Sequence, residues 1–375
     1  YLINVMKRDL YIDFAKGLAT LSIVFIHTAF WSGQLYLPAE VRTLSLLIDV
    51  PVFFALSGLT SGNNVEKTLY RLLKLQVTYM IFVTFLFFLD GIMKWGIFGI
   101  FGTEGMQSYY TVFGTKYAVP SVDSAFNWDI LGNWFLHSYS NCDSFPVVMG
   151  SFWYLKVYYI VTVFGVLVLK FFSQHVKWII GVCLALTIYF NIDNDVMKNF
   201  APYYPSGQVG YVAYYLAVFL IATQLKGKKI KDVFVPVLYG LVALSLVIVF
   251  WYFGNEVFYK FNKQKFPPKI PYIVWSLLSL VTIFVLYNRL KITKDNFINY
   301  IGKNAIFYYF AQGMSSSVVY FLVAALKESV NTWVLMVLIY VLNVALAIVF
   351  AEILKKIDDY GWKVLEFLRK KTAKN

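Results

Sequence analysis

Ten runs of apolar residues are the feature that most constrains how this chain folds. Most of them reach the length of about 20 residues that an α-helix needs to cross a lipid bilayer. They cover residues 14–33, 43–60, 72–90, 152–172, 178–191, 209–225, 233–253, 271–288, 298–325 and 332–353. Charged residues make up only 14% of the sequence, against about 25% in soluble domains. We therefore predict an all-α integral membrane protein, a bundle of about ten transmembrane helices.

The basic residues indicate how these helices are oriented. The chain has 33 Lys and Arg residues and a formal charge of +13, and most of the basic residues lie between the apolar runs. With a cytoplasmic amino terminus, 22 of them fall on the cytoplasmic side and nine on the outer side. Because cytoplasmic loops are the basic ones in membrane proteins, we predict both termini in the cytoplasm. Topology then accounts for the charge, and no nucleic acid partner is expected.

We predict a single transmembrane domain over residues 1–354, followed by a basic tail over residues 355–375. Apolar positions recur between the basic residues of the tail, at Ile357, Tyr360, Val364 and Leu368. This pattern favours an amphipathic helix that lies on the inner membrane surface and binds lipids. The alternative is a solvated tail.

The longest predicted outer loop covers residues 103–150. Its Asn, Ser, Tyr and Trp residues suit contact with a sugar, and they suit equally the aromatic belt of a membrane interface. His137 and Cys142 also lie in this loop, while Cys183 lies in an apolar run. A disulfide framework is therefore not expected. No Cys or His spacing typical of a metal site occurs, so we expect no metal.

The first apolar run carries three side chains suited to chemistry: Asp13, Lys16 and His27. Lys16 and His27 are 11 residues apart, close to three helical turns, so both lie on one helix face with about 16 Å between them. Asp13 is placed to pair with Lys16. Ionisable groups inside a span are functional candidates, and a histidine can take a proton near neutral pH. The alternative is a packed histidine bonded to a helix carbonyl.

Three further residues of the early runs complete this set. Asp49 is predicted to lie at a depth similar to that of His27, where it would orient the imidazole; alternatively it faces outer water. Arg71 and Lys74 share a face at the inner start of the third run. Together with Lys16 they would form a basic cluster that holds phosphates, which suits a cytoplasmic coenzyme A thioester.

The order of several short motifs resembles that of the membrane-bound acyltransferase 3 family, whose hallmark is a basic residue, ten others and a histidine. In this chain Lys16 and His27 have that spacing, and the lysine form is common in the branch that acts on bacterial surface polysaccharides. The other matching segments are Pro51–Gly58, Arg71–Lys74, Phe152–Leu155 and Ile301–Tyr309. Gln312 stands where many members have a histidine, which leaves His27 as the one histidine expected in a span.

The resemblance implies a multi-pass enzyme of the bacterial plasma membrane. Acetyl-CoA, or another acyl-CoA, would bind from the cytoplasm, and the acyl group would pass to a hydroxyl of a cell-surface or lipid-linked glycan outside. His27 would act as general base, and transfer needs donors for the oxyanion. We predict this role for Trp153, Asn304, Tyr309 and Gln312. For Asn304 and Gln312 the alternative is hydrogen bonding between helices.

Two other classes of protein compete with this interpretation. A transporter or flippase for a glycan or lipid-linked glycan also needs many helices and charges in a pore, but its helices would be broken by Gly or Pro in symmetric halves, which is not evident here. A receptor or scaffold would not require Lys16 and His27 on one face.

Overall fold

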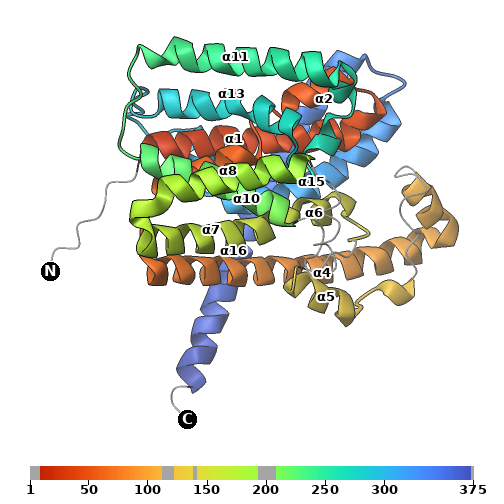
Figure 1. Ribbon diagram of the computed structural model, residues 1–375. Helices are drawn as coiled ribbons and strands as arrows, with labels where there is room; N and C mark the ends of the chain where they lie inside the picture. Colours follow the sequence, from red (N-terminus) through yellow and green to blue (C-terminus); the bar gives the residue numbers. More distant parts are fainter. Residues whose placement is uncertain (1–8, 112–121, 138–141, 193–207, 373–375) are drawn as a thin grey trace. The chain divides into compact units, whose positions relative to one another are not determined.

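The computed structural model describes residues 9–111, 122–137, 142–192 and 208–372 (Figure 1). The first eight residues and the last three residues of the predicted tail lie outside these ranges. All regular structure in the described ranges is helical. The prediction of an all-α fold is confirmed.

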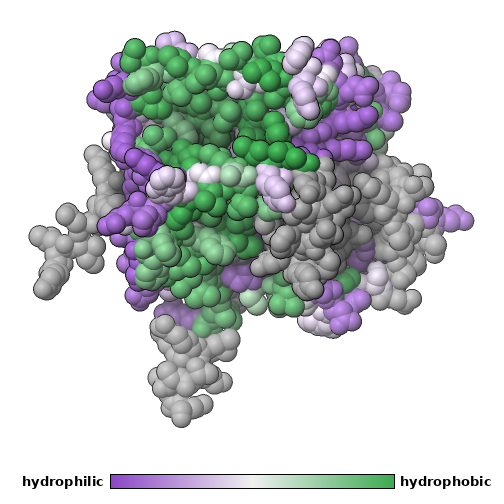
Figure 2. Space-filling model, viewed as in Figure 1, coloured by the Kyte–Doolittle hydropathy of each residue, from purple (hydrophilic) through white to green (hydrophobic). Residues whose placement is uncertain are grey.

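The predicted spans correspond to helices of the structure. Within the described ranges, eight segments are long and apolar enough to cross a bilayer, and two shorter apolar helices cover Gly210–Leu225 and Ile270–Leu286. Some of these segments expose apolar surface, as in α11 (Phe234–Phe253), where Leu244 is 56% and Trp251 85% exposed. Hydrophobic side chains cover the helices on the visible face of Figure 2. Lipid removes the cost of this exposure, and a bundle of about ten transmembrane helices is consistent with it.

The chain divides into two units by its contacts. The first unit comprises Tyr1–Ile26, Pro38–Leu69 and Val157–Ala305, and the second comprises His27–Leu37, Tyr70–Lys156 and Ile306–Asn375. Four helices continue from one unit into the other: α1 (Leu10–Phe30), α4 (Val65–Thr111), α7 (Trp153–Phe171) and α15 (Ala305–Leu326).

In the first unit, α10 (Gln208–Leu225) packs against α3 (Val50–Thr60) and α8 (Val176–Ile192). In the same unit, α13 (Ile270–Leu286) packs against α11 and α3. A Cβ at Gly58 would collide with Phe219 and Ala222, so this glycine permits the close approach of α3 and α10. The remaining described helices of the unit are α2 (Ala39–Ser45), η3 (Ser173–His175), α12 (Glu256–Tyr259), η5 (Phe261–Gln264) and α14 (Phe297–Lys303).

In the second unit, α15 and α16 (Thr332–Thr372) share a core of Val319, Val323, Leu335 and Ile339. α16 continues without a break past residue 354, so the described part of the predicted tail is helical. The unit also contains η1 (Ser32–Leu35), η2 (Val122–Ser124), α5 (Trp128–Phe135) and α6 (Pro146–Ser151).

Three predicted spans differ from uninterrupted helices of the expected length. Run 43–60 is interrupted between α2 and α3, because the backbone of Asp49 is extended. Pro51 follows in the first turn of α3, the part of a helix that accepts proline. Run 298–325 is interrupted at Asn304, between α14 and α15. The third span is longer than predicted, because Gly91–Phe101 extends α4, which changes direction at Gly102 with φ of 64°.

Candidate active site

The helix α1 carries Asp13, Lys16 and His27. The structure places Lys16 and His27 on one uninterrupted helix, which preserves the spacing of about 16 Å expected from the helical rise. Asp13 is buried, with 3% of its surface exposed, while Lys16 and His27 are half-buried. The two basic side chains therefore remain accessible on a helix that is otherwise packed.

In the first unit, α14 crosses the first turns of α1 at very close range. A Cβ at Gly302 would collide with the Asp13 carbonyl oxygen, and one at Gly17 would collide with Ile298. The Asn299 side chain donates to the Leu10 carbonyl at 2.7 Å. Glycine is required at both positions because any side chain would separate the helices.

Asn304 follows α14, two residues after Gly302. Asn304 donates its side-chain amide to the carbonyl of Tyr300 at 2.9 Å, within its own helix. Lys303 pairs with Asp295. In the structure, the Asn304 amide caps the end of α14. Its predicted role as a hydrogen-bond donor to the oxyanion remains a prediction.

Asp49 is the centre of a buried polar cluster in the first unit. Its carboxylate lies 2.9 Å from the Lys265 ammonium and accepts a hydrogen bond from the Tyr272 hydroxyl at 2.7 Å. Asp49 is 1%, Lys265 5% and Tyr272 0% exposed. The alternative that Asp49 faces water is therefore wrong. His27 belongs to the second unit, so pairing between Asp49 and His27 remains a prediction.

In the second unit, a buried hydrogen-bond network holds the end of α1 that contains His27. The Asn343 side-chain amide donates to the Thr28 hydroxyl at 2.8 Å and to the Ser316 hydroxyl at 3.0 Å. These three residues are at most 1% exposed. The network fixes Thr28, the neighbour of His27, against α15 and α16.

Gln312 lies on the same helix as Ser316, one turn earlier, and is fully buried. Its Nε2 donates to the Tyr309 carbonyl at 3.2 Å. Its Oε1 has no hydrogen-bond partner among the described residues. A buried amide oxygen without a partner costs free energy unless a ligand or water satisfies it. In this orientation the open end of Gln312 is an acceptor, so donation to an oxyanion would require the amide to rotate.

Tyr309 connects α15 to the start of α7. Its hydroxyl donates to the Ser151 carbonyl at 2.6 Å, and its ring lies 5.7 Å from that of Tyr154. Trp153 contacts Tyr154 with ring centroids 6.4 Å apart. The structure therefore brings the predicted residues Trp153 and Tyr309 into one aromatic group within the second unit, and Tyr309 lies on α15, the helix that also carries Gln312.

The first turns of α4 carry the exposed residues Arg71 and Lys74. The Lys74 ammonium lies 5.7 Å above the ring of Trp362 on α16. A Cβ at Gly361 would crowd Ile81, which shows how closely the two helices approach. Lys74 is thus held beside α16, and Arg71 is open to solvent.

Asn343 was not predicted as a site residue, and the contacts of His137 were not predicted either. Asn343 could have been noticed as an amide inside the last apolar run, where polar side chains often connect helices. The position of His137 in an outer loop remains a prediction, and its ring stacks on Tyr79 of α4 with centroids 4.2 Å apart. The ring is stabilised there by a hydrogen bond to Gln76 at 2.8 Å.

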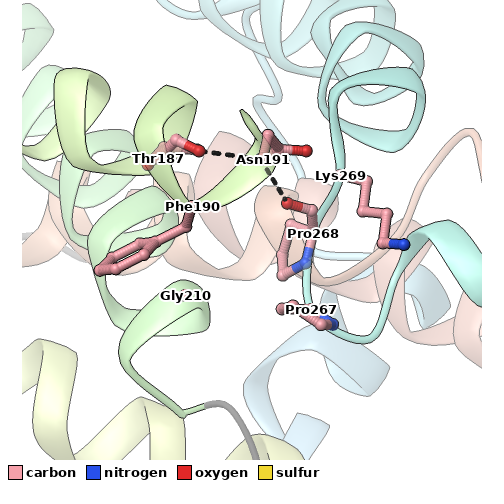
Figure 3. A pocket seen from close by; sticks show the side chains of 7 residues that line it. All are labelled: Thr187, Phe190, Asn191, Gly210, Pro267, Pro268 and Lys269. Atoms are coloured by element: carbon pink, nitrogen blue, oxygen red, sulfur yellow. Dashed lines mark hydrogen bonds between the residues drawn. The ribbon is translucent and has the colours of Figure 1, made fainter. Parts of the chain in front are cut away.

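A small pocket of the first unit carries no candidate chemistry (Figure 3). The Asn191 amide points across it and donates to the carbonyls of Thr187 and Pro268 at 2.8 and 3.4 Å. The Asn191 oxygen accepts from the Ile270 amide. The polar atoms of Asn191 are therefore already bonded within the protein. They hold the loop at Pro268 in place. Elsewhere in the described ranges, no group of three His, Cys, Asp or Glu residues is arranged to hold a metal.

Comparison with known proteins gives one finding. The family model Acyl_transf_3, described as an acyltransferase domain, matches residues 9–352. No curated protein and no solved structure matches the chain.

Proposed function

Because the chain belongs to the acyltransferase 3 family, which matches nearly its whole length, we propose that it transfers an acyl group from acyl-CoA to a glycan hydroxyl. The family supports an acyltransferase and, with the apolar helices, a multi-pass membrane protein. The proposal adds the donor, acetyl-CoA bound from the cytoplasm, and the acceptor, a surface or lipid-linked glycan outside a bacterial plasma membrane. Both termini then lie in the cytoplasm.

The observation that carries the proposal is the arrangement around His27. The Thr28, Asn343 and Ser316 network fixes the end of α1 against the stretch of α15 that carries Gln312. The half-buried His27 directly precedes Thr28 in this network, and Gln312, whose buried amide oxygen has no partner among the described residues, lies one turn before Ser316. Rigid placement of a base is what proton transfer in catalysis requires.

In the proposed reaction, His27 takes the proton of the acceptor hydroxyl. The hydroxyl oxygen forms a bond to the thioester carbonyl carbon, and the carbon–sulfur bond breaks as coenzyme A leaves. His27 returns the proton to the sulfur. Gln312 orients the hydroxyl through its oxygen, or stabilises the oxyanion through its nitrogen after rotation of the amide.

Lys16, Arg71 and Lys74 bind the phosphates of the donor in this proposal. Arg71 is exposed and Lys74 lies at the same end of α4, as an anion site open to the cytoplasm requires. We expect Arg71→Ala to raise KM for acetyl-CoA with a nearly unchanged kcat, because phosphate binding is equal in the ground and transition states. An unchanged affinity for coenzyme A in the alanine variants of all three residues would reject this assignment.

The direct test is transfer of a radiolabelled acetyl group from acetyl-CoA to a bacterial surface glycan by the purified protein in lipid vesicles. The expected result is label on the glycan that depends on the protein and is lost in His27→Gln. Translocation of the glycan without label would instead identify a flippase.

A further inference from the structure

Two short loops of the first unit lie together at one end of the helices α11 and α13. One loop, residues 226–233, joins α10 to α11, and the other, residues 287–296, joins α13 to α14. α11 and α13 pack against each other, as Figure 1 shows. The hydroxyl of Tyr239, near the start of α11, lies 2.9 Å from the hydroxyl of Thr282, near the end of α13. The start of one helix is therefore beside the end of the other, and both loops lie at that end.

Hydrogen bonds join the two loops into one surface. The Arg289 guanidinium donates to the Ile230 carbonyl at 2.7 Å and to the Asp232 carboxylate at 2.5 Å. The Asn288 side-chain amide donates to the Lys228 carbonyl at 3.2 Å. Each of these contacts crosses from the second loop to the first, so the side chains of both loops are presented together.

This joined surface, which we call the basic platform, has a large excess of positive charge. Its two loops contain seven basic and two acidic residues. Both acidic residues form ion pairs, Asp232 with Arg289 and Asp295 with Lys303. The exposed basic residues are Lys226, Lys228, Lys229, Lys231, Lys291 and Lys294. The platform thus complements a ligand that carries negative charge.

Exposed apolar side chains border the platform where its loops meet the helices. They belong to Val233 and Phe234 at the start of α11, to Leu286 at the end of α13, and to Leu290 within the second loop. At the left edge of Figure 2, hydrophilic residues lie directly beside the hydrophobic surface. α11 is long and apolar enough to cross a bilayer, so its first residues stand where acyl chains meet head groups. A phospholipid offers a phosphate and acyl chains together, whereas a nucleotide or an acidic peptide would match only the charge.

We propose that the basic platform binds anionic phospholipids of the leaflet around it. Lys228 and Lys231 contact the phosphate groups of these lipids, and Phe234 and Leu286 contact their acyl chains. Arg289 holds the two loops together, so that lysines of both loops act on the same head groups. With both termini in the cytoplasm, as we predict, this leaflet is the inner one. Clusters of basic residues directly beside a span attract anionic lipids in this way.

The test measures which lipid the full chain binds after it has been purified in detergent and depleted of lipid. Phosphatidylglycerol, which is anionic, and phosphatidylcholine, which is zwitterionic, are added in equal amounts, and native mass spectrometry gives the ratio bound. Lys226 and Lys229 also have contacts within the protein, so the variant is Lys228→Gln with Lys231→Gln. We expect the wild type to prefer phosphatidylglycerol at least tenfold. The variant should lose at least fivefold of this preference, because two ammonium groups that attract the lipid charge are gone.

The matched control is Lys260→Gln with Lys263→Gln, which removes two exposed lysines from the segment before α13. It changes the net charge by the same amount and should keep the wild-type preference. An equal preference in the wild type and in Lys228→Gln with Lys231→Gln, or an equal loss in the control, would overturn the proposal. Weaker binding of coenzyme A with an unchanged lipid ratio would also overturn it, because the platform would then belong to the donor site. The lipid ratio is measured without any acyl transfer, so its outcome is independent of the proposed reaction.

Discussion

Asn343 donates its side-chain amide to the Thr28 hydroxyl at 2.8 Å and thereby joins the last apolar helix to the residue that follows His27. The second hydrogen of the same amide reaches Ser316. Three helices thus meet at one buried amide. This relationship gives α1 a defined position in the second unit, and it is the basis for placing chemistry at His27.

Replacement of Asn343 should therefore weaken both the fold and the transfer reaction. Asn343→Leu leaves two buried hydroxyls without their donor, which costs about 1–3 kcal/mol for each group left unsatisfied. We expect a lower melting temperature in detergent and a reduced kcat with KM for acetyl-CoA little changed. Val341→Ala, at a 60% exposed position of the same helix, should leave both unaffected. A wild-type kcat in Asn343→Leu would show that the network does not position His27.

The buried pair of Asp49 and Lys265 should behave as a unit. Removal of one partner, in Asp49→Asn or Lys265→Met, leaves a buried charge uncompensated and should cost about 3–5 kcal/mol. The double variant should be more stable than either single variant. Thermal unfolding of the four proteins measures this coupling. Additive losses would mean that the two side chains act independently.

The group of Lys94, Asp90 and Asp143 should hold the segment at Asp143 against α4. Lys94 lies 3.1 Å from Asp90 and 2.6 Å from Asp143, and it is 2% exposed. Lys94→Ala leaves two carboxylates together, so it should destabilise the protein more than Asp143→Ala. Lys260→Ala removes an exposed pair with Glu256 and should change stability by less than about 1 kcal/mol.

The effect of Lys94→Ala should also depend on pH. Burial raises the pKa of the Asp143 carboxyl, although Lys94 opposes this effect. Without Lys94, protonation of this carboxyl relieves the repulsion. The melting temperature of Lys94→Ala should therefore lie closer to that of wild type at pH 5 than at pH 8. An equal difference at both values would show that charge is not the cause.

Membrane orientation can be tested with single cysteines, because the native Cys142 and Cys183 are buried. Glu104→Cys, at an exposed position of α4, should react with a membrane-impermeant thiol reagent added to intact cells. Lys229→Cys should react only after the membrane is opened. The reverse pattern would place the termini outside.

The apolar runs and the motif spacing predicted the helices because lipid imposes length and hydropathy on each span independently. They did not predict the interruptions at Asp49 and Asn304, which depend on local caps. The partners of Asp49 could not be predicted either, since Lys265 is more than 200 residues away and lay in an expected outer loop. The contacts of His137 were not predicted for a similar reason, because Gln76, which bonds its ring, is 61 residues away in the sequence.

The most direct test of the account is the rate of acetyl transfer by His27→Gln. An amide keeps the hydrogen-bonding capacity of the imidazole but does not take up a proton, and general base catalysis typically contributes ~10²–10⁴-fold. We predict at least a hundredfold lower kcat, with coenzyme A binding and melting temperature unchanged. Near-normal turnover by His27→Gln would contradict the account and identify His27 as a packed structural residue.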